Sequence, residues 1–142
     1  EIILAGRRLN DSMGKHVATE TIKHMMRKDL KVIDSKVLIL GFTFKEDCPD
    51  VRNTRVIDIY RELQSFDMDV CVYDPWADVA EVMHEYGMVS SKKIPKTKFD
   101  AIVLTVAHNE FMNLNFSLLT KDNAVIYDVK NILPNSLADM TL

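Results

Sequence analysis

The sequence predicts an α/β protein: a three-layer α/β/α domain on a parallel sheet of about five strands, preceded by a long helix. Two observations lead to this prediction. Short apolar runs alternate with amphipathic helical patterns along the chain, which is the order of β-α-β units. In addition, the apolar run at residues 37–40 breaks at Gly41 into a polar loop, and a helical pattern follows. A buried parallel strand leads into its crossover helix in this way.

Residues 9–30 are predicted to form the first helix. Apolar residues recur every fourth position and a second row widens the stripe: Leu9, Met13, Val17, Thr21 and Met25, with Ala18, Ile22 and Met26. Gly14 weakens this helix by up to about 1 kcal/mol relative to alanine. The broad, methionine-rich face suits packing against another chain, and it equally suits an ordinary helix that packs on its own core.

The remaining elements follow in order. Strands are predicted at residues 36–42, 69–73, 100–106 and 124–127, and helices at 54–66, 78–86 and, briefly, 115–119. Asn53 is the expected N-cap of the second helix. Gly87 is expected to end the third helix, and Val89 lies in a weak candidate for one more short strand.

Composition excludes several functions. A chain of 142 residues is long enough for one domain with a core, and its net charge of -3 argues against nucleic-acid binding. No apolar run approaches the roughly 20 residues that span a membrane. Cys48 and Cys71 are too few for a disulfide framework and fit no zinc pattern, so we expect a reducing cytoplasm. Because the first residue is Glu1 rather than Met, we expect a piece of a longer chain.

Polar residues follow each of the four clear strands, in the segments GFTFKED, YDPW, TVAHNE and YDVKN. The carboxyl ends of parallel strands meet at one edge of a sheet, where ligands bind. We therefore expect Lys45, Arg52 and Lys130 to converge there. Three further residues should lie close by: Asp74, His108 and Asp128. Two or three cations beside a helix amino terminus predict a phosphate or diphosphate site.

Four other side chains allow more than one interpretation. From the residues alone, Phe44 is expected to turn into the core. Trp76 could stack on a base or cover the sheet. His108 is interpreted as a hydrogen-bonded structural histidine rather than an acid or base. Cys48 has no adjacent histidine to activate it, so we assign no catalytic residue, and we assign no metal ligand either.

No GxGxxG motif is present, so the predicted Rossmann-like sheet lacks the fingerprint of a dinucleotide site. Two other functions remain open. A receiver-like signalling domain would use Asp74 as phosphoacceptor beside the acidic pair at residues 46–47, with Thr105 and Lys130 as a switch pair. A pure assembly module would use only the methionine-rich helix.

Four segments of the sequence, taken in order, resemble those of a known protein family: GRRLNDSMGKHVA, LGFTFKEDCPDVRNTRV, VYDPW and YDVKNILP. They resemble the carboxyl-terminal, UDP-sugar-binding part of the UDP-glucose/GDP-mannose dehydrogenase family over nearly the whole chain. The block around FKEDCPD, together with YDVKNILP, is most similar to members that act on UDP-N-acetylglucosamine or UDP-N-acetylgalactosamine.

The resemblance implies an enzyme that oxidises the C6 alcohol of a UDP-sugar to a carboxylate with NAD, for surface polysaccharides. It places the catalytic cysteine and the main NAD-binding domain upstream of this sequence, so we expect these 142 residues alone to be inactive. Residues 1–32 would end the central helix between domains, and 33–142 would form the UDP-sugar-binding domain. The helical region at 9–30 would form a homodimer.

The resemblance also assigns site residues one by one. Phe44 and Lys45 match the substrate contacts of the family, and Arg52 matches an arginine that reaches the NAD from the same loop. Lys130 falls where many members have an arginine that binds the nucleotide sugar. A lysine keeps the charge there but gives up the bidentate fork.

Overall fold

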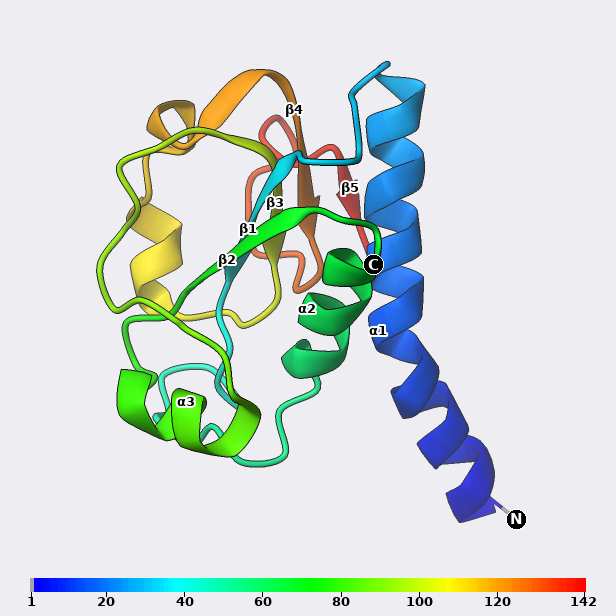
Figure 1. Ribbon diagram of the computed structural model, residues 1–142, viewed down its shortest axis with the longest axis vertical. Helices are drawn as coiled ribbons and strands as arrows, with labels where there is room; N and C mark the ends of the chain where they lie inside the picture. The colour runs from blue at the N-terminus through cyan, green and yellow to red at the C-terminus, as the bar shows by residue number, and fades with distance from the viewer. Residues whose placement is uncertain (1) are drawn as a thin grey trace.

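The computed structural model describes the backbone of residues 2–142 and the side chains of residues 12–142. Within this part of the chain, five strands form one parallel sheet in the order β2-β1-β3-β4-β5. Their bounds are Lys36–Leu40 for β1, Asp69–Tyr73 for β2, Phe99–Leu104 for β3, Thr120–Asp128 for β4 and Met140–Thr141 for β5. The predicted α/β fold with a leading helix is confirmed (Figure 1).

The register of the central strands aligns their carboxyl ends. Leu40 at the end of β1 lies opposite Tyr73 of β2 on one side and Leu104 of β3 on the other. Leu104 in turn lies opposite Asp128, the last residue of β4. The four predicted polar segments therefore leave the sheet at one edge.

Two helices, α1 (Ile2–Arg27) and α2 (Val56–Ser65), lie along one face of the sheet (Figure 1). Residues of α1 that are buried in the core of this face are Val17, Ala18, Ile22 and Met25. The two helices approach closely at Gly14, where an added Cβ would lie only 2.6 Å from the Cβ of Asp58. Gly14 thus provides the space for helix packing, and this space offsets its poor helix propensity.

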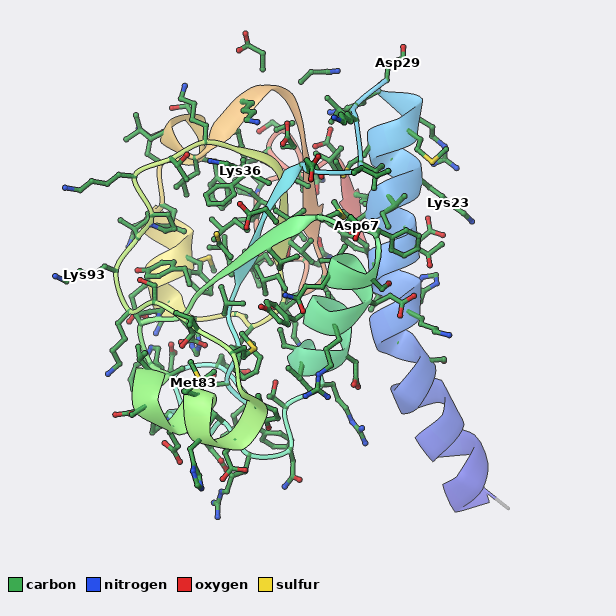
Figure 2. All side chains as sticks on the ribbon, viewed as in Figure 1. Lys23, Asp29, Lys36, Asp67, Met83 and Lys93 are labelled. Carbon is green, nitrogen blue, oxygen red and sulfur yellow. The ribbon has the colours of Figure 1, made fainter. Side chains whose placement is uncertain are left out.

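The methionine-rich stripe of α1 is divided between core and solvent. Met25 is fully buried, whereas Met13 is 38% and Met26 62% exposed. Lys23 lies on the side of the helix away from the sheet (Figure 2). No helix among the described residues is both long and apolar enough to cross a bilayer.

The opposite face of the sheet is covered by two short 3-10 helices, η1 (Asn109–Asn113) and η2 (Phe116–Leu118). Their Phe111 and Phe116 form a second core with Leu38, Ile102 and other residues of the sheet. The outer layer on this side therefore consists of 3-10 turns. Only the second of them was predicted, as the short helical stretch at residues 115–119.

Helix α3 (Val79–Tyr86) lies near the carboxyl ends of β1 and β2 (Figure 1). The Asp78 carboxylate caps it by accepting the Glu81 N–H at 2.9 Å, and Gly87 ends it in the left-handed conformation at φ 66°. The predicted end at Gly87 is confirmed. The weak strand signal at Val89 corresponds to an isolated bridge between Ser91 and Tyr73.

The predicted cap of α2 is wrong. Asn53 adopts a positive φ of 60° within a turn, and the N-cap residue is Arg55. The Thr54 hydroxyl accepts the Val56 N–H at 3.2 Å instead. The threonine directly after Asn53 therefore performs the expected role.

Candidate functional site

Gly41 turns the chain sharply at the end of β1. Its φ is +99°, and an added Cβ would lie 2.6 Å from the Cβ of Val106 and 2.9 Å from its backbone nitrogen. The Thr105 hydroxyl donates to the Gly41 carbonyl at 2.6 Å. Only glycine fits between β1 and the segment after β3, so the following loop leaves the sheet beside that segment.

A cleft of about 250 Å³ opens at this edge of the sheet; we call it the cation cleft. It is lined by the loop after β1, the start of α2 and the ends of β3 and β4, through Thr43, Phe44, Lys45, Glu46, Asn53, Thr54, Arg55, Val56, Thr105, Val106 and Lys130. Lys45 and Lys130, which are 85 positions apart in sequence (130 − 45), share it. Their expected convergence is confirmed.

The amino end of α2 borders the cation cleft through Arg55 and Val56. Backbone N–H groups and the helix dipole both favour an anion at such an end. Among the described residues that line the cleft, Arg55 adds a third cation to Lys45 and Lys130, and Glu46 supplies a carboxylate. The cleft therefore has the charge and backbone donors that bind a phosphate or diphosphate.

Phe44 is 59% exposed and lines the cation cleft. The expectation that it turns into the core is wrong, because Phe42 and Val51 already fill the core on either side of the loop. An exposed aromatic ring beside three cations leaves its face available to a ligand.

The structure does not bring Arg52 into the cation cleft. Arg52 lines a separate hollow with Cys48, Pro49, Asp50 and Glu81. Its Nε donates to the Asp50 carboxylate at 3.1 Å, and this hydrogen bond holds the pKa of Asp50 below its ordinary value. Arg55, three residues later, occupies the place in the cation cleft that was expected for Arg52.

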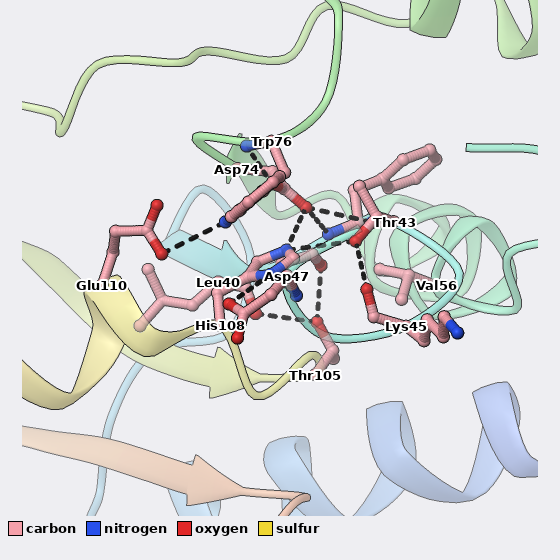
Figure 3. Close-up of polar contacts among 12 residues, drawn as sticks. Leu40, Thr43, Lys45, Asp47, Val56, Asp74, Trp76, Thr105, His108 and Glu110 are labelled. Carbon is pink, nitrogen blue, oxygen red and sulfur yellow. Dashed lines mark hydrogen bonds and ion pairs between the residues drawn. The ribbon is translucent and has the colours of Figure 1, made fainter. Parts of the chain in front are cut away.

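Asp74, at the end of β2, is the centre of a buried polar network (Figure 3). Its Oδ2 accepts the N–H groups of Phe42 at 2.6 Å and Thr43 at 3.0 Å, and its Oδ1 accepts that of Trp76 at 2.8 Å. Burial acts to raise the pKa of Asp74. The hydrogen bonds from His108 and the backbone amides outweigh it, so the pKa lies below its ordinary value.

His108 completes this network and is fully buried. Its Nδ1 accepts the Asp47 N–H at 2.9 Å, so the neutral ring carries its proton on Nε2, which lies 3.0 Å from Asp74 Oδ2 and 3.1 Å from Thr43 Oγ1. The interpretation of His108 as a hydrogen-bonded structural residue is confirmed. Trp76 stacks over the imidazole at 6.1 Å between centroids and donates to Glu110 at 3.1 Å.

Strand β4 ends at Asp128, which is fully buried. Its Oδ2 accepts the Leu133 N–H at 2.7 Å and so shapes the turn that carries Lys130. Lys130 itself is exposed at the mouth of the cation cleft.

These geometries argue against a receiver-like domain. Asp74 is buried and both its oxygens accept backbone amides, so it is not placed as a phosphoacceptor. Among the described residues, no group of three or more His, Cys, Asp or Glu side chains could hold a metal ion.

Comparisons with known proteins identify a family. Residues 38–135 match the UDP-binding domain of the UDP-glucose/GDP-mannose dehydrogenase family. The whole chain is 46% identical to a UDP-N-acetyl-D-glucosamine 6-dehydrogenase of Salmonella typhi and 45% identical to one of Pseudomonas aeruginosa. It spans 34% of the length of each of these two proteins.

A solved structure of another dehydrogenase has the same fold as this chain. An NDP-N-acetyl-D-galactosaminuronic acid dehydrogenase from Methanosarcina mazei Go1 superposes with a TM-score of 0.83 at 28% identity. That alignment covers 94% of this chain and 28% of the other. From the matched domain and these relatives, we conclude that the chain belongs to the UDP-glucose/GDP-mannose dehydrogenase family.

Proposed function

We propose that this chain is the nucleotide-sugar-binding domain of an NAD-dependent UDP-sugar 6-dehydrogenase, and that the cation cleft holds the diphosphate. The observation that carries the proposal is the meeting of Lys45, Arg55 and Lys130 at the amino end of α2. Within the family's UDP-binding domain, a cleft with three cations and a helix end suits a nucleoside diphosphate. The exposed ring of Phe44 would contact the substrate beside them.

The parent enzyme would oxidise the C6 alcohol of the sugar to a carboxylate, in the cytoplasm, as a step toward surface polysaccharides. We expect the chain alone to lack this activity, because the family's catalytic cysteine has no counterpart in it. Arg52, exposed in its own hollow and paired with Asp50, would contact NAD held mainly by another domain. An exposed guanidinium suits the phosphates of that cofactor.

We also propose that residues 1–32 end an inter-domain helix and that residues 33–142 are the binding domain. The second half of α1 contributes Val17, Ala18, Ile22 and Met25 to the core of the sheet. Lys28 reinforces this attachment, since its Nζ donates to the Ala124 carbonyl at 3.0 Å and to Asp139 at 2.8 Å.

A homodimer through the region of residues 9–30 is proposed from the outer face of α1. Changing Met26, which is 62% exposed, to glutamate should shift the protein toward monomer without unfolding it. Sedimentation velocity measures the change. Met25→Glu is the contrasting variant: it places a charge in the core, so it should unfold the domain. Dimerisation unaffected by Met26→Glu would remove this face from the interface.

Lys45→Ala tests the proposed diphosphate site. The loss of a hydrogen bond to a charged group should weaken UDP binding by about 1.5–3 kcal/mol, which corresponds to roughly 10- to 150-fold. Isothermal titration calorimetry with UDP measures it on the 142-residue chain. The matched control is Lys98→Ala, an exposed lysine just before β3 at the opposite edge of the sheet. Equal affinities of the two variants would remove Lys45 from the site.

A further inference from the structure

The loop of residues 43–47 places Phe44 and Lys45 at the cation cleft, although it contains no helix or strand. A loop without regular structure needs contacts from elsewhere to hold one conformation. Asp47, at its end, also has a positive φ of 54°, which costs energy for a residue other than glycine. Side chains outside the loop must therefore stabilise this conformation.

The start of the loop is held by Asp74, the residue directly after β2. The N–H groups of Phe42 and Thr43 both donate to Asp74 Oδ2, at 2.6 and 3.0 Å. The Thr43 hydroxyl then donates to the Lys45 carbonyl at 3.0 Å, which fixes the backbone of the residue that carries the cation.

The end of the loop is held from the segment after β3. The Asp47 N–H donates to His108 Nδ1 at 2.9 Å. The Asp47 carboxylate accepts the backbone N–H of Asn109 at 3.0 Å and its side-chain amide at 2.7 Å. The imidazole itself is held between the Trp76 ring, at 6.1 Å, and the Phe111 ring, at 5.3 Å.

We propose that His108 is a positioning residue for UDP-sugar binding: its imidazole joins both ends of the loop and so sets where Lys45 stands. This inference rests on the proposed function of the cation cleft. His108 Nε2 lies 3.0 Å from Asp74 Oδ2 at the start of the loop, while Nδ1 accepts the Asp47 amide at its end (Figure 3). The ring is fully buried and does not line the cleft, so it acts on the ligand through the loop.

Two substitutions test the two ring nitrogens separately. In His108→Asn, the amide oxygen can occupy the place of Nδ1 and accept the Asp47 N–H, but the donor to Asp74 is lost. In His108→Gln, the amide nitrogen can occupy the place of Nε2 and donate to Asp74, but the acceptor for Asp47 is lost. Both variants leave space where the ring was, so a purely packing role predicts equal effects.

The experiment measures UDP affinity by calorimetry, and hydrogen exchange of the Asp47 amide without ligand, at a temperature where each variant is folded. We expect His108→Gln to speed exchange and to weaken UDP binding at least about 10-fold. His108→Asn should retain slower exchange and lose less affinity, because it keeps the bond to Asp47 and Asp74 still accepts the Phe42 and Thr43 amides at the start of the loop. Equal behaviour of the two variants would overturn the proposal. If the wild-type chain fails to bind UDP, the proposed function fails, whereas the exchange rates still decide the role of His108 in the loop.

Asn109→Ala keeps the proposal testable where the buried variants do not fold. Asn109 is exposed, and the change removes only its side-chain bond to Asp47. We expect faster exchange of the Asp47 amide and a roughly threefold loss of UDP affinity. A threefold loss corresponds to about half the energy of one net hydrogen bond to a charged group. A loss of UDP affinity without faster exchange of the Asp47 amide would overturn the proposal, because binding would then not depend on how firmly the loop is held.

Discussion

Replacing Asp74 with alanine is expected to lower the free energy of unfolding by about 3–5 kcal/mol, the cost of breaking a buried hydrogen-bonded pair. The change leaves the Phe42, Thr43 and Trp76 amides and the His108 ring without their acceptor in a fully buried place. Urea denaturation followed by circular dichroism measures the loss.

Asp78→Ala is the matched control for Asp74→Ala. Asp78 also accepts a backbone N–H, that of Glu81 at 2.9 Å, but it does so on the exposed end of α3. Its removal should cost only about 1 kcal/mol, the usual value for an N-cap. Similar losses in the two variants would show that the buried network contributes no more than a surface cap.

At low pH, the wild-type protein should lose the contribution of the Asp74 carboxylate to the free energy of unfolding. The pKa of Asp74 is lower in the folded protein than the value of about 3.9 in an unfolded chain. Its stabilisation is therefore fully present above that unfolded pKa and is lost as the pH falls through the folded pKa. The difference in unfolding free energy between wild type and Asp74→Ala should shrink correspondingly below about pH 4.

Gly41→Ala is expected to destabilise the domain by about 2–4 kcal/mol, from backbone strain and from overpacking against Val106. The new methyl group would meet the Val106 side chain at 2.6 Å and its backbone nitrogen at 2.9 Å, at a φ of +99°. Thermal or urea unfolding measures the change. Because Gly41 begins the turn toward the cation cleft, we expect weaker UDP binding as well.

Gly87→Ala provides the comparison for Gly41→Ala. Gly87 also has a positive φ, 66°, but nothing lies within 4 Å of an added Cβ. That substitution should cost about 1–2 kcal/mol, from the left-handed backbone alone. A Gly41→Ala variant no less stable than Gly87→Ala would show that Val106 moves aside without cost.

The buried strands could be predicted because each one is a short apolar run in the sequence. Residues 69–73 were placed within the correct bounds, since an apolar run between polar residues suffices to locate a buried strand. Strand β5, Met140–Thr141, was missed because two residues give no periodic signal. It forms because Asp139 accepts the Ile126 N–H at 2.7 Å, a contact across the sheet that local pattern does not contain.

The position of the candidate site could be predicted from the sequence, but the residues that line it could be predicted only in part. Lys45 and Lys130 each follow a predicted strand, and the carboxyl ends of parallel strands lie at one edge of the sheet. Parallel topology alone therefore brings the two lysines together. Whether Arg52 or Arg55 faces the cleft depends on the turn between them, where Asn53 takes a positive φ of 60°. The exposure of Phe44 could not be predicted for a similar reason: it depends on Phe42 and Val51, which occupy the core before and after it in the chain.

The close packing of α1 on α2 at Gly14 gives the first helix a mechanical role. Fourteen residues separate this contact from the Lys28 attachment to Asp139 (28 − 14), so the helix is held at two points about 21 Å apart. Beyond Gly14 its amino-terminal part extends past the carboxyl edge of the sheet (Figure 1). Because α1 packs directly on α2 at Gly14, a change in the tilt of α1 would be transmitted to α2, whose amino end carries Arg55 at the rim of the cation cleft.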